Sequence, residues 1–188
     1  DAKMGYEACL QALEHPATAM GNVGAGTGAT VGKLCGMERA SKTGIGCYAM
    51  ALGELQVAAV VVVNALGDIF DPANGMKIAG LMNEDRTAFG DSCEELWKLG
   101  CPQNLFTGNT TIGAVITNGQ FNKAQMNKIA SMTRNAYARC INPVGTMADG
   151  DSIYAASIGD VKADINVTGT LAAHVMERAI VKAVESAR

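Results

Sequence analysis

The 188-residue chain has the length of a single domain with a substantial core, since domains commonly hold roughly 100–200 residues. Its composition, 48% apolar and 18% charged, excludes a disordered segment. A net charge of −3 without a basic run offers nothing for nucleic acid. The longest apolar stretch, Val57 to Val63, is far shorter than the roughly 20 residues that span a bilayer. We therefore expect a soluble protein with neither a nucleic-acid nor a membrane partner.

The six cysteines lie far apart and form no CxxC or Cys/His pattern. A chain of this size does not need disulfides to stabilise its core. We therefore expect reduced thiols, a cytoplasmic location and no bound metal.

The first half of the chain predicts a short helix, a glycine-rich loop and a group of strands. The helix runs from Lys3 to His15 and ends there because a residue before proline avoids the helical region. Five glycines between residues 21 and 33 predict a loop. The β-branched and small apolar runs that follow predict adjacent strands, of which we expect the middle one to be buried on both faces: Ile45–Leu52, Leu55–Val63 and Asp68–Phe70.

The second half alternates between strands and helices. The pattern predicts an exposed connection, Leu81–Gly108, with a short helix near its middle. Asn122 and Gln125 have the spacing of a capping box that opens a helix. The expected elements are a strand over 110–117, a helix over 122–140, a strand over Ser152–Ile158 and a helix over Val167–Ala187. Together the elements predict a mixed α/β fold.

The glycine-rich loop invites a phosphate-binding interpretation. Its pattern fails as a P-loop because Thr27 stands where the first glycine is needed and Leu34 follows Lys33. The dinucleotide-binding pattern also fits poorly, because no strand precedes the loop. Lys33 alone is typical of a solvated surface lysine, so its interest depends on its neighbours.

A polar turn at Gly108-Asn109 leads directly into a strand that begins with Thr110. This pattern is typical of a simple turn before a strand. It also fits a chain cut between Asn109 and Thr110, which would give Thr110 a free α-amine beside its own hydroxyl. A nucleophile that carries its own base would need no histidine, and the sequence offers no obvious Ser/His/Asp triad.

Asp149-Gly150-Asp151 places two carboxylates just before a strand. The pattern is common in Asp-Gly turns. A calcium loop is disfavoured because Ile153 stands where another oxygen ligand is needed. If both carboxylates face a cleft, they could orient a nearby ammonium group.

Taken together, these motifs resemble the L-aminopeptidase/D-esterase family of N-terminal-nucleophile peptidases, and most of all its nylon-oligomer (6-aminohexanoate oligomer) hydrolase branch. The resemblance runs in order across almost the whole chain. It rests on Gly24-Ala25-Gly26, Gly32-Lys33, Val60-Val61-Val62-Val63-Asn64, Gly108-Asn109-Thr110-Thr111-Ile112, Asp149-Gly150-Asp151-Ser152 and the end of the last helix.

The resemblance implies an α/β fold built as a four-layer αββα sandwich and a precursor that cleaves itself. Thr110 would be the nucleophile, and Asn109 would supply the carbonyl that is cleaved. Lys33 matches an active-site lysine, and Asn64 matches an asparagine that stabilises the oxyanion. Asp149 and Asp151 match two acidic residues near the nucleophile. The chain would be a single domain over 1–188, lacking an upstream segment that family members carry, and processed into 1–109 and 110–188.

The implied function is hydrolysis of amide bonds in small peptides or other amides through an acyl-enzyme. It requires no metal or cofactor, and the family suggests a homo-oligomer of two-chain units. Two alternatives stay open at this point. One is a catalytically silent protein that binds a small molecule on the same fold. The other is an acyltransferase in which an amine takes the acyl group from the same nucleophile.

Overall fold

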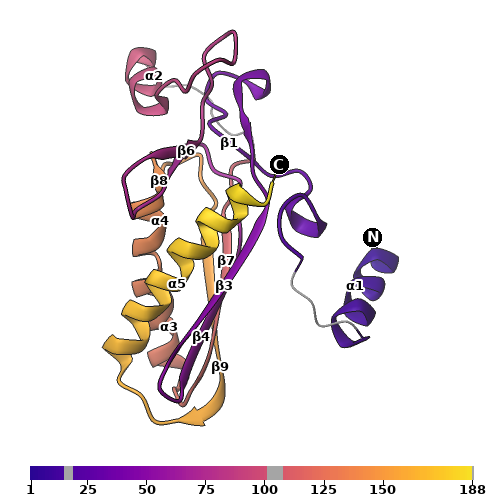
Figure 1. The fold of residues 1–188 in the computed structure, drawn as a ribbon, viewed down its shortest axis with the longest axis vertical. Coiled ribbons are helices and arrows are strands. Elements are labelled where there is room, and N and C mark those ends of the chain that lie inside the picture. Colours follow the sequence, from indigo (N-terminus) through magenta and orange to yellow (C-terminus); the bar gives the residue numbers. More distant parts are fainter. Residues whose placement is uncertain (15–18, 101–107, 188) are drawn as a thin grey trace.

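The computed structural model describes residues 1–14, 19–100 and 108–187 (Figure 1). Its largest sheet has the strand order β3-β4-β7-β9, with β3 at Ile45–Leu52, β4 at Leu55–Val62, β7 at Ile112–Gly119 and β9 at Ser152–Val161. Strand β4 runs antiparallel to both neighbours, whereas β7 and β9 are parallel. Parallel neighbours need a long crossover, and here it contains α3 (Lys123–Thr133) and α4 (Asn135–Cys140).

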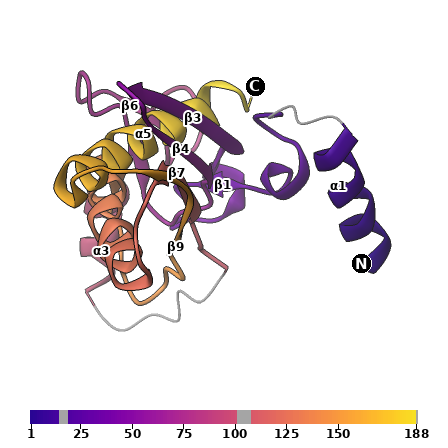
Figure 2. The same ribbon diagram turned by 90° about the horizontal axis from the view of Figure 1, so that it is seen from below.

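One face of this sheet carries the helices. Figures 1 and 2 show α5 (Ile165–Glu185) lying across β3 and β4, with α3 beside it on the same side. Side chains alternate along a strand, so every second residue of β4 faces α5. These residues form the centre of the core and are at most 5% exposed: Leu55, Val57, Ala59 and Val61.

The opposite face of the sheet is open among the described residues. Its exposed apolar side chains lie on β7 and β9: Ile112, Ile116, Tyr154 and Ile158. A shallow apolar groove of about 370 Å³ crosses this face between β3 and Ile158. Within the described residues the strand at 55–63 is therefore covered on one face and not on both as expected, because Gln56 and alternate residues of β4 face this open side.

Two smaller sheets lie beside the main one. Strand β5 (Asp68–Phe70) pairs with β6 (Lys77–Ala79) and with β8 (Ile141–Asn142). The third expected strand therefore belongs to a separate sheet and is not a neighbour of β4. Strand β1 (Thr30–Val31) follows the short 3₁₀ helix Gly24–Gly26, and β2 (Ser41–Lys42) follows the 3₁₀ helix Met37–Arg39 and precedes β3. The two strands pair with each other in an antiparallel ladder.

The helices follow the sequence pattern with shifted ends. The capping box is confirmed, because Asn122 Oδ1 accepts from the Gln125 backbone N–H and Gln125 Oε1 accepts from the Asn122 N–H. The expected helix over 122–140 is interrupted at Arg134, between α3 and α4. Asp164 caps α5, which begins two residues before the expected start.

The first helix, α1 (Ala2–Glu14), buries none of its side chains. The expected exposed connection starts at Leu81, which is fully buried, and contains α2 (Ser92–Leu99); its residues 101–107 lie outside the described part of the chain. None of the described helices is both long and apolar enough to cross a membrane. The elements confirm a mixed α/β fold.

Candidate active site

Lys33 and Asn64 meet at the end of β4. The Lys33 ammonium donates to Asn64 Oδ1 at 2.8 Å and reaches the Asn64 carbonyl oxygen at 3.4 Å. Asn64 Oδ1 also accepts from the backbone N–H of Thr30, at 3.3 Å, and its Nδ2 donates to the Gly108 carbonyl at 2.8 Å. Lys33 is only 9% exposed, so it is not the solvated lysine that its isolated position in the sequence suggests.

The loop that carries Lys33 is fixed from behind. Gly32 donates its N–H to the Gly67 carbonyl at 3.1 Å, and a Cβ at Gly32 would overlap the backbone of Leu81. With φ at +67°, Gly32 also holds a conformation that other residues rarely adopt. The Leu81 N–H in turn donates to Asp68 Oδ1 at 2.8 Å. Glycine is therefore required beside Lys33 for both space and conformation.

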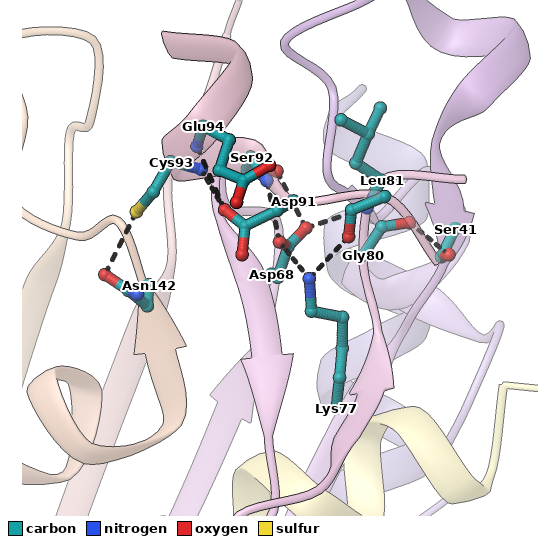
Figure 3. A network of polar contacts seen from close by, with 11 residues as sticks. Ser41, Asp68, Lys77, Gly80, Leu81, Asp91, Ser92, Cys93, Glu94 and Asn142 are labelled. Carbon is teal, nitrogen blue, oxygen red and sulfur yellow. Dashed lines mark hydrogen bonds and ion pairs between the residues drawn. The ribbon is translucent and has the colours of Figure 1, made fainter. Parts of the chain in front are cut away.

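Asp68 is the centre of the polar network in Figure 3. Its carboxylate accepts from Lys77 Nζ at 2.7 Å, and from the N–H and hydroxyl of Ser92 at 3.0 and 2.7 Å. Asp68 lies on β5 and is 1% exposed, whereas its donors Lys77 and Ser92 lie on β6 and at the start of α2. Asp68 thus joins Leu81, which packs on the Lys33 loop, to the start of α2. This is why the segment 81–92, expected to be exposed, is buried at Leu81 and Ser92.

The junction between Asn109 and Thr110 lies at one end of the main sheet, just before the central strand β7. The Thr110 backbone nitrogen donates to the Asn64 carbonyl at 2.8 Å, so it shares this acceptor with the Lys33 ammonium. The Thr110 hydroxyl donates to the Asn109 carbonyl at 2.6 Å. The same carbonyl accepts the Gly150 N–H at 2.9 Å. The Thr110 hydroxyl, the Thr110 backbone nitrogen and the Asn109 carbonyl are therefore all held by hydrogen bonds.

Asp149 and Asp151 reach this junction in different ways. Asp149 pairs through its backbone with Asn109, and its Oδ2 accepts from both the N–H and the hydroxyl of Thr146. Asp151 Oδ1 accepts the N–H of Thr111, at 2.7 Å. Asp151 thus holds the residue after Thr110, and the two carboxylates do not play equivalent parts.

Four residues at the junction contain buried polar atoms without a hydrogen-bond partner. Over the described ranges 1–14, 19–100 and 108–187, all such side-chain atoms lie here: Asn109 Nδ2 and Oδ1, Thr111 Oγ1, Asp149 Oδ1 and Asp151 Oδ2. Each unpaired buried group costs about 1–3 kcal/mol. The junction is therefore the region where the buried side-chain polar atoms of the described structure lack partners.

The charges at the site are perturbed by burial. Burial lowers the pKa of Lys33 from its ordinary 10.5 to about 8, against the opposing attraction of Asp149. Burial also raises the pKa of Asp151 above its ordinary value. Among the described residues, no cluster of His, Cys, Asp or Glu is arranged to hold a metal ion.

A hollow of about 360 Å³ opens beside Thr110. The polar residues that line the hollow are Asn64 and Thr110. The rest of the lining is small or apolar: Ala25, Gly28, Ala29, Val62 and Ile112. The glycine-rich loop thus forms a wall of this hollow. Its small side chains leave room for a ligand next to the Thr110 hydroxyl.

The structure brings together all six residues singled out in the sequence, with one difference for Asn64. Asn64 Nδ2 contacts the carbonyl of Gly108, whereas the donor to the Asn109 carbonyl is the Gly150 N–H. Sequence reasoning missed Gly150 and Thr146. The glycine of the Asp-Gly-Asp motif was the signal for Gly150. The structure explains it, because a Cβ there would lie 2.7 Å from Thr110 Oγ1 and glycine allows this close approach.

Comparisons with known proteins show the family of the chain. Residues 2–188 match the model of peptidase family S58. The chain is 34% identical to an uncharacterized aminopeptidase of Mycobacterium leprae over 172 residues, which cover 86% of this chain and 45% of the relative. It is 30% identical over 179 residues to a 6-aminohexanoate-oligomer endohydrolase of a Kocuria species, with 87% and 50% covered. The chain thus spans about half the length of these relatives.

Solved structures show the same fold at lower identity. An L-aminopeptidase D-Ala-esterase/amidase of Ochrobactrum anthropi, described as a variant of the Ntn hydrolase fold, aligns with a TM-score of 0.62 at 17% identity, over 91% of this chain and 46% of that one. A Burkholderia β-aminopeptidase aligns with a TM-score of 0.59 at 19% identity, over 90% and 47%. The chain belongs to peptidase family S58.

Proposed function

We propose that the protein is a self-processing hydrolase with an N-terminal threonine, which cleaves amide bonds through an acyl-enzyme. The observation that carries this proposal is the arrangement at Thr110. Its hydroxyl lies on the carbonyl of Asn109, and its backbone nitrogen shares an acceptor with the buried Lys33 ammonium. This arrangement places the Thr110 hydroxyl beside the carbonyl that it would attack and the Thr110 nitrogen beside a buried cation, which supports a nucleophile that carries its own base.

Self-cleavage would begin when Thr110 Oγ bonds to the carbonyl carbon of Asn109. The C–N bond then breaks, and the hydroxyl proton ends on the departing nitrogen, so that the amide becomes an ester. Water hydrolyses this ester, leaving a carboxylate on Asn109 and a free α-amine on Thr110. The products would be the chains 1–109 and 110–188 of a single domain.

The unpaired atoms at the junction support this step. A free α-amine has one more N–H donor than the amide, and it would lie in a region where Asp149 Oδ1 and Asp151 Oδ2 lack partners. Release of Asn109 would also remove a buried amide that has none. Cleavage therefore relieves a polar deficit that the uncleaved chain carries.

Hydrolysis of a substrate would use the same groups. The neutral α-amine takes the Thr110 hydroxyl proton while Oγ attacks the substrate carbonyl, and water later hydrolyses the acyl-enzyme. The Lys33 ammonium favours the neutral amine because two like charges on one acceptor repel. Asn64 Nδ2, once separated from Gly108, is free to donate to the developing oxyanion. Loss of one such donor costs about 3–4 kcal/mol of transition-state stabilisation.

The open sheet face supports a four-layer αββα architecture for the whole protein. An apolar sheet face of this kind is normally covered by a second layer. Thr110 lies at the end of β7 on the side of Ile112, so a second sheet would also close the hollow beside the nucleophile. The cytoplasmic location and the homo-oligomer of two-chain units stay predictions.

The substrate class follows the relatives. They are named aminopeptidases, a β-aminopeptidase and an endohydrolase of 6-aminohexanoate oligomers. A suitable panel therefore contains an α-aminoacyl amide, a β-aminoacyl amide and a 6-aminohexanoate oligomer. Addition of a free amine distinguishes transfer of the acyl group from hydrolysis.

Two substitutions of Thr110 test the proposal in the full-length protein. Thr110→Ala is expected to abolish both self-cleavage and hydrolysis, while Thr110→Ser keeps a hydroxyl and retains both at reduced rates. Thr87→Ala, on an exposed turn where Thr87 is hydrogen-bonded to Asn83 and Asp85, is the control and should behave as wild type. Hydrolysis by Thr110→Ala at the wild-type rate would refute the mechanism.

A further inference from the structure

The turn over residues 146–150 is held by Thr146, whose carbonyl accepts the Asp149 N–H at 3.1 Å and whose side chain adds further hydrogen bonds. The Thr146 hydroxyl donates to Asp149 Oδ2 at 2.8 Å, and the Thr146 N–H donates to the same oxygen at 3.0 Å. The hydroxyl also accepts the Ala148 N–H at 3.2 Å. Between them lies Met147, which is 88% exposed, so packing contributes little to the shape of this turn. The hydrogen bonds of Thr146 fix it instead.

This turn supplies the contacts to the junction. Asp149 pairs with Asn109 in a parallel bridge, and the Gly150 N–H donates to the Asn109 carbonyl at 2.9 Å. When Thr110 Oγ attacks this carbonyl, negative charge develops on the oxygen that the Gly150 N–H already contacts. Donors aimed at such an oxygen act through their position, and a small displacement weakens them steeply.

Thr146 also holds the carboxylate of Asp149 in one orientation. Both donors from Thr146 go to Oδ2, whereas Oδ1 is buried without a partner. Without the Thr146 hydroxyl, the carboxylate would keep one of these two donors and could tilt away from the turn. Hydrogen bonds to a charged group are the strong ones, so the pair of donors holds the carboxylate firmly.

We propose that Thr146 is a positioning residue for self-cleavage: through Asp149 it fixes the turn that places the Gly150 N–H on the carbonyl to be cleaved. The inference rests on the proposed self-processing at Asn109-Thr110. Thr146 touches no reacting atom and acts through the two residues that follow it. Its chemical requirement is a hydroxyl, because the N–H donor is present in any non-proline residue.

The test compares Thr146→Ser with Thr146→Ala, since these variants differ by the hydroxyl alone. Full-length protein is made by cell-free synthesis, and intact-mass spectrometry follows the uncleaved chain over time. Thr146→Ala is expected to cleave at least about tenfold more slowly than wild type, because a hydrogen bond to a charged group is lost. Thr146→Ser should restore a rate close to wild type.

Thr87 provides the matched control. Its hydroxyl and N–H contact Asp85 Oδ1 at 2.7 and 3.3 Å, in an exposed turn away from the junction. Thr87→Ala should cleave at the wild-type rate. Melting temperatures of all variants show that the comparison is made between folded proteins.

The outcomes separate the two proposals. If wild type never cleaves, the proposed function fails. If wild type cleaves and Thr146→Ala keeps pace with Thr146→Ser, the positioning role of Thr146 is refuted while the proposed function stands. Equal slowing in Thr87→Ala would also refute it, because the effect would then be general to such turns.

Discussion

Lys33 should make the folded protein less stable at neutral pH than an uncharged side chain of similar length. Burial lowers the pKa of Lys33 from 10.5 to about 8, so the folded state holds this proton less tightly than the unfolded chain does. The penalty is fully present below the folded pKa and disappears as the pH rises toward 10.5. It amounts to about 3.4 kcal/mol at pH 7 and about 0.8 kcal/mol at pH 10.

Lys33→Met removes this penalty together with the hydrogen bond to Asn64 Oδ1. The lost hydrogen bond costs about 1 kcal/mol at either pH, so the comparison between two pH values isolates the charge. Relative to the parent, the free energy of unfolding of Lys33→Met should fall by about 2.5 kcal/mol between pH 7 and pH 10.

Denaturant titrations at the two pH values measure this difference, with both proteins in a Thr110→Ala background so that neither chain is cleaved. If the difference in unfolding free energy between the two proteins is the same at pH 7 and pH 10, the lowered pKa of a buried Lys33 is contradicted.

Three further predictions concern the same site. Hydrolysis by the wild type should rise with pH as the Thr110 α-amine loses its proton, and Lys33→Met, which removes the repelling ammonium, should move this limb of the pH–rate profile to higher pH; an unmoved limb would refute this role of Lys33. Asp151→Asn keeps an oxygen for the Thr111 N–H but loses the charge, so kcat should fall at least about tenfold with an unchanged melting temperature; full activity would show that the charge is not needed. Gly32→Ala should lower the free energy of unfolding by at least about 2 kcal/mol in denaturant titrations, since its Cβ meets the Leu81 backbone at a positive φ, and a neutral effect would refute that contact.

Local patterns predicted the elements of the fold well. The capping box at Asn122 and the apolar alternation of β4 follow from hydrogen bonding and burial within a short stretch of chain. The position of β5 did not follow, because it pairs with β6 and with β8, and β8 lies far away in the sequence. The open face of β4 was also missed, since a run of valines looks the same whether one or both faces are covered.

The candidate site shows a similar division. Motif resemblance selected Lys33, Asn64 and Thr110, and the structure brings them together. No local pattern reveals that Lys33 is buried, because its burial comes from the hydrogen bond to Asn64 and from a loop fixed on Leu81. Thr146 was also missed. Its proposed role depends on the Asn109 carbonyl, which lies far away in the sequence, as well as on the nearby carboxylate of Asp149.

The central claim is that the chain is cut between Asn109 and Thr110. Intact-mass spectrometry of the purified full-length protein under denaturing conditions tests it most directly. The account predicts two polypeptides whose masses place the cut at this junction, and a single uncut chain in Thr110→Ala. A single uncut mass for the wild type, or a cut at another bond, would contradict it.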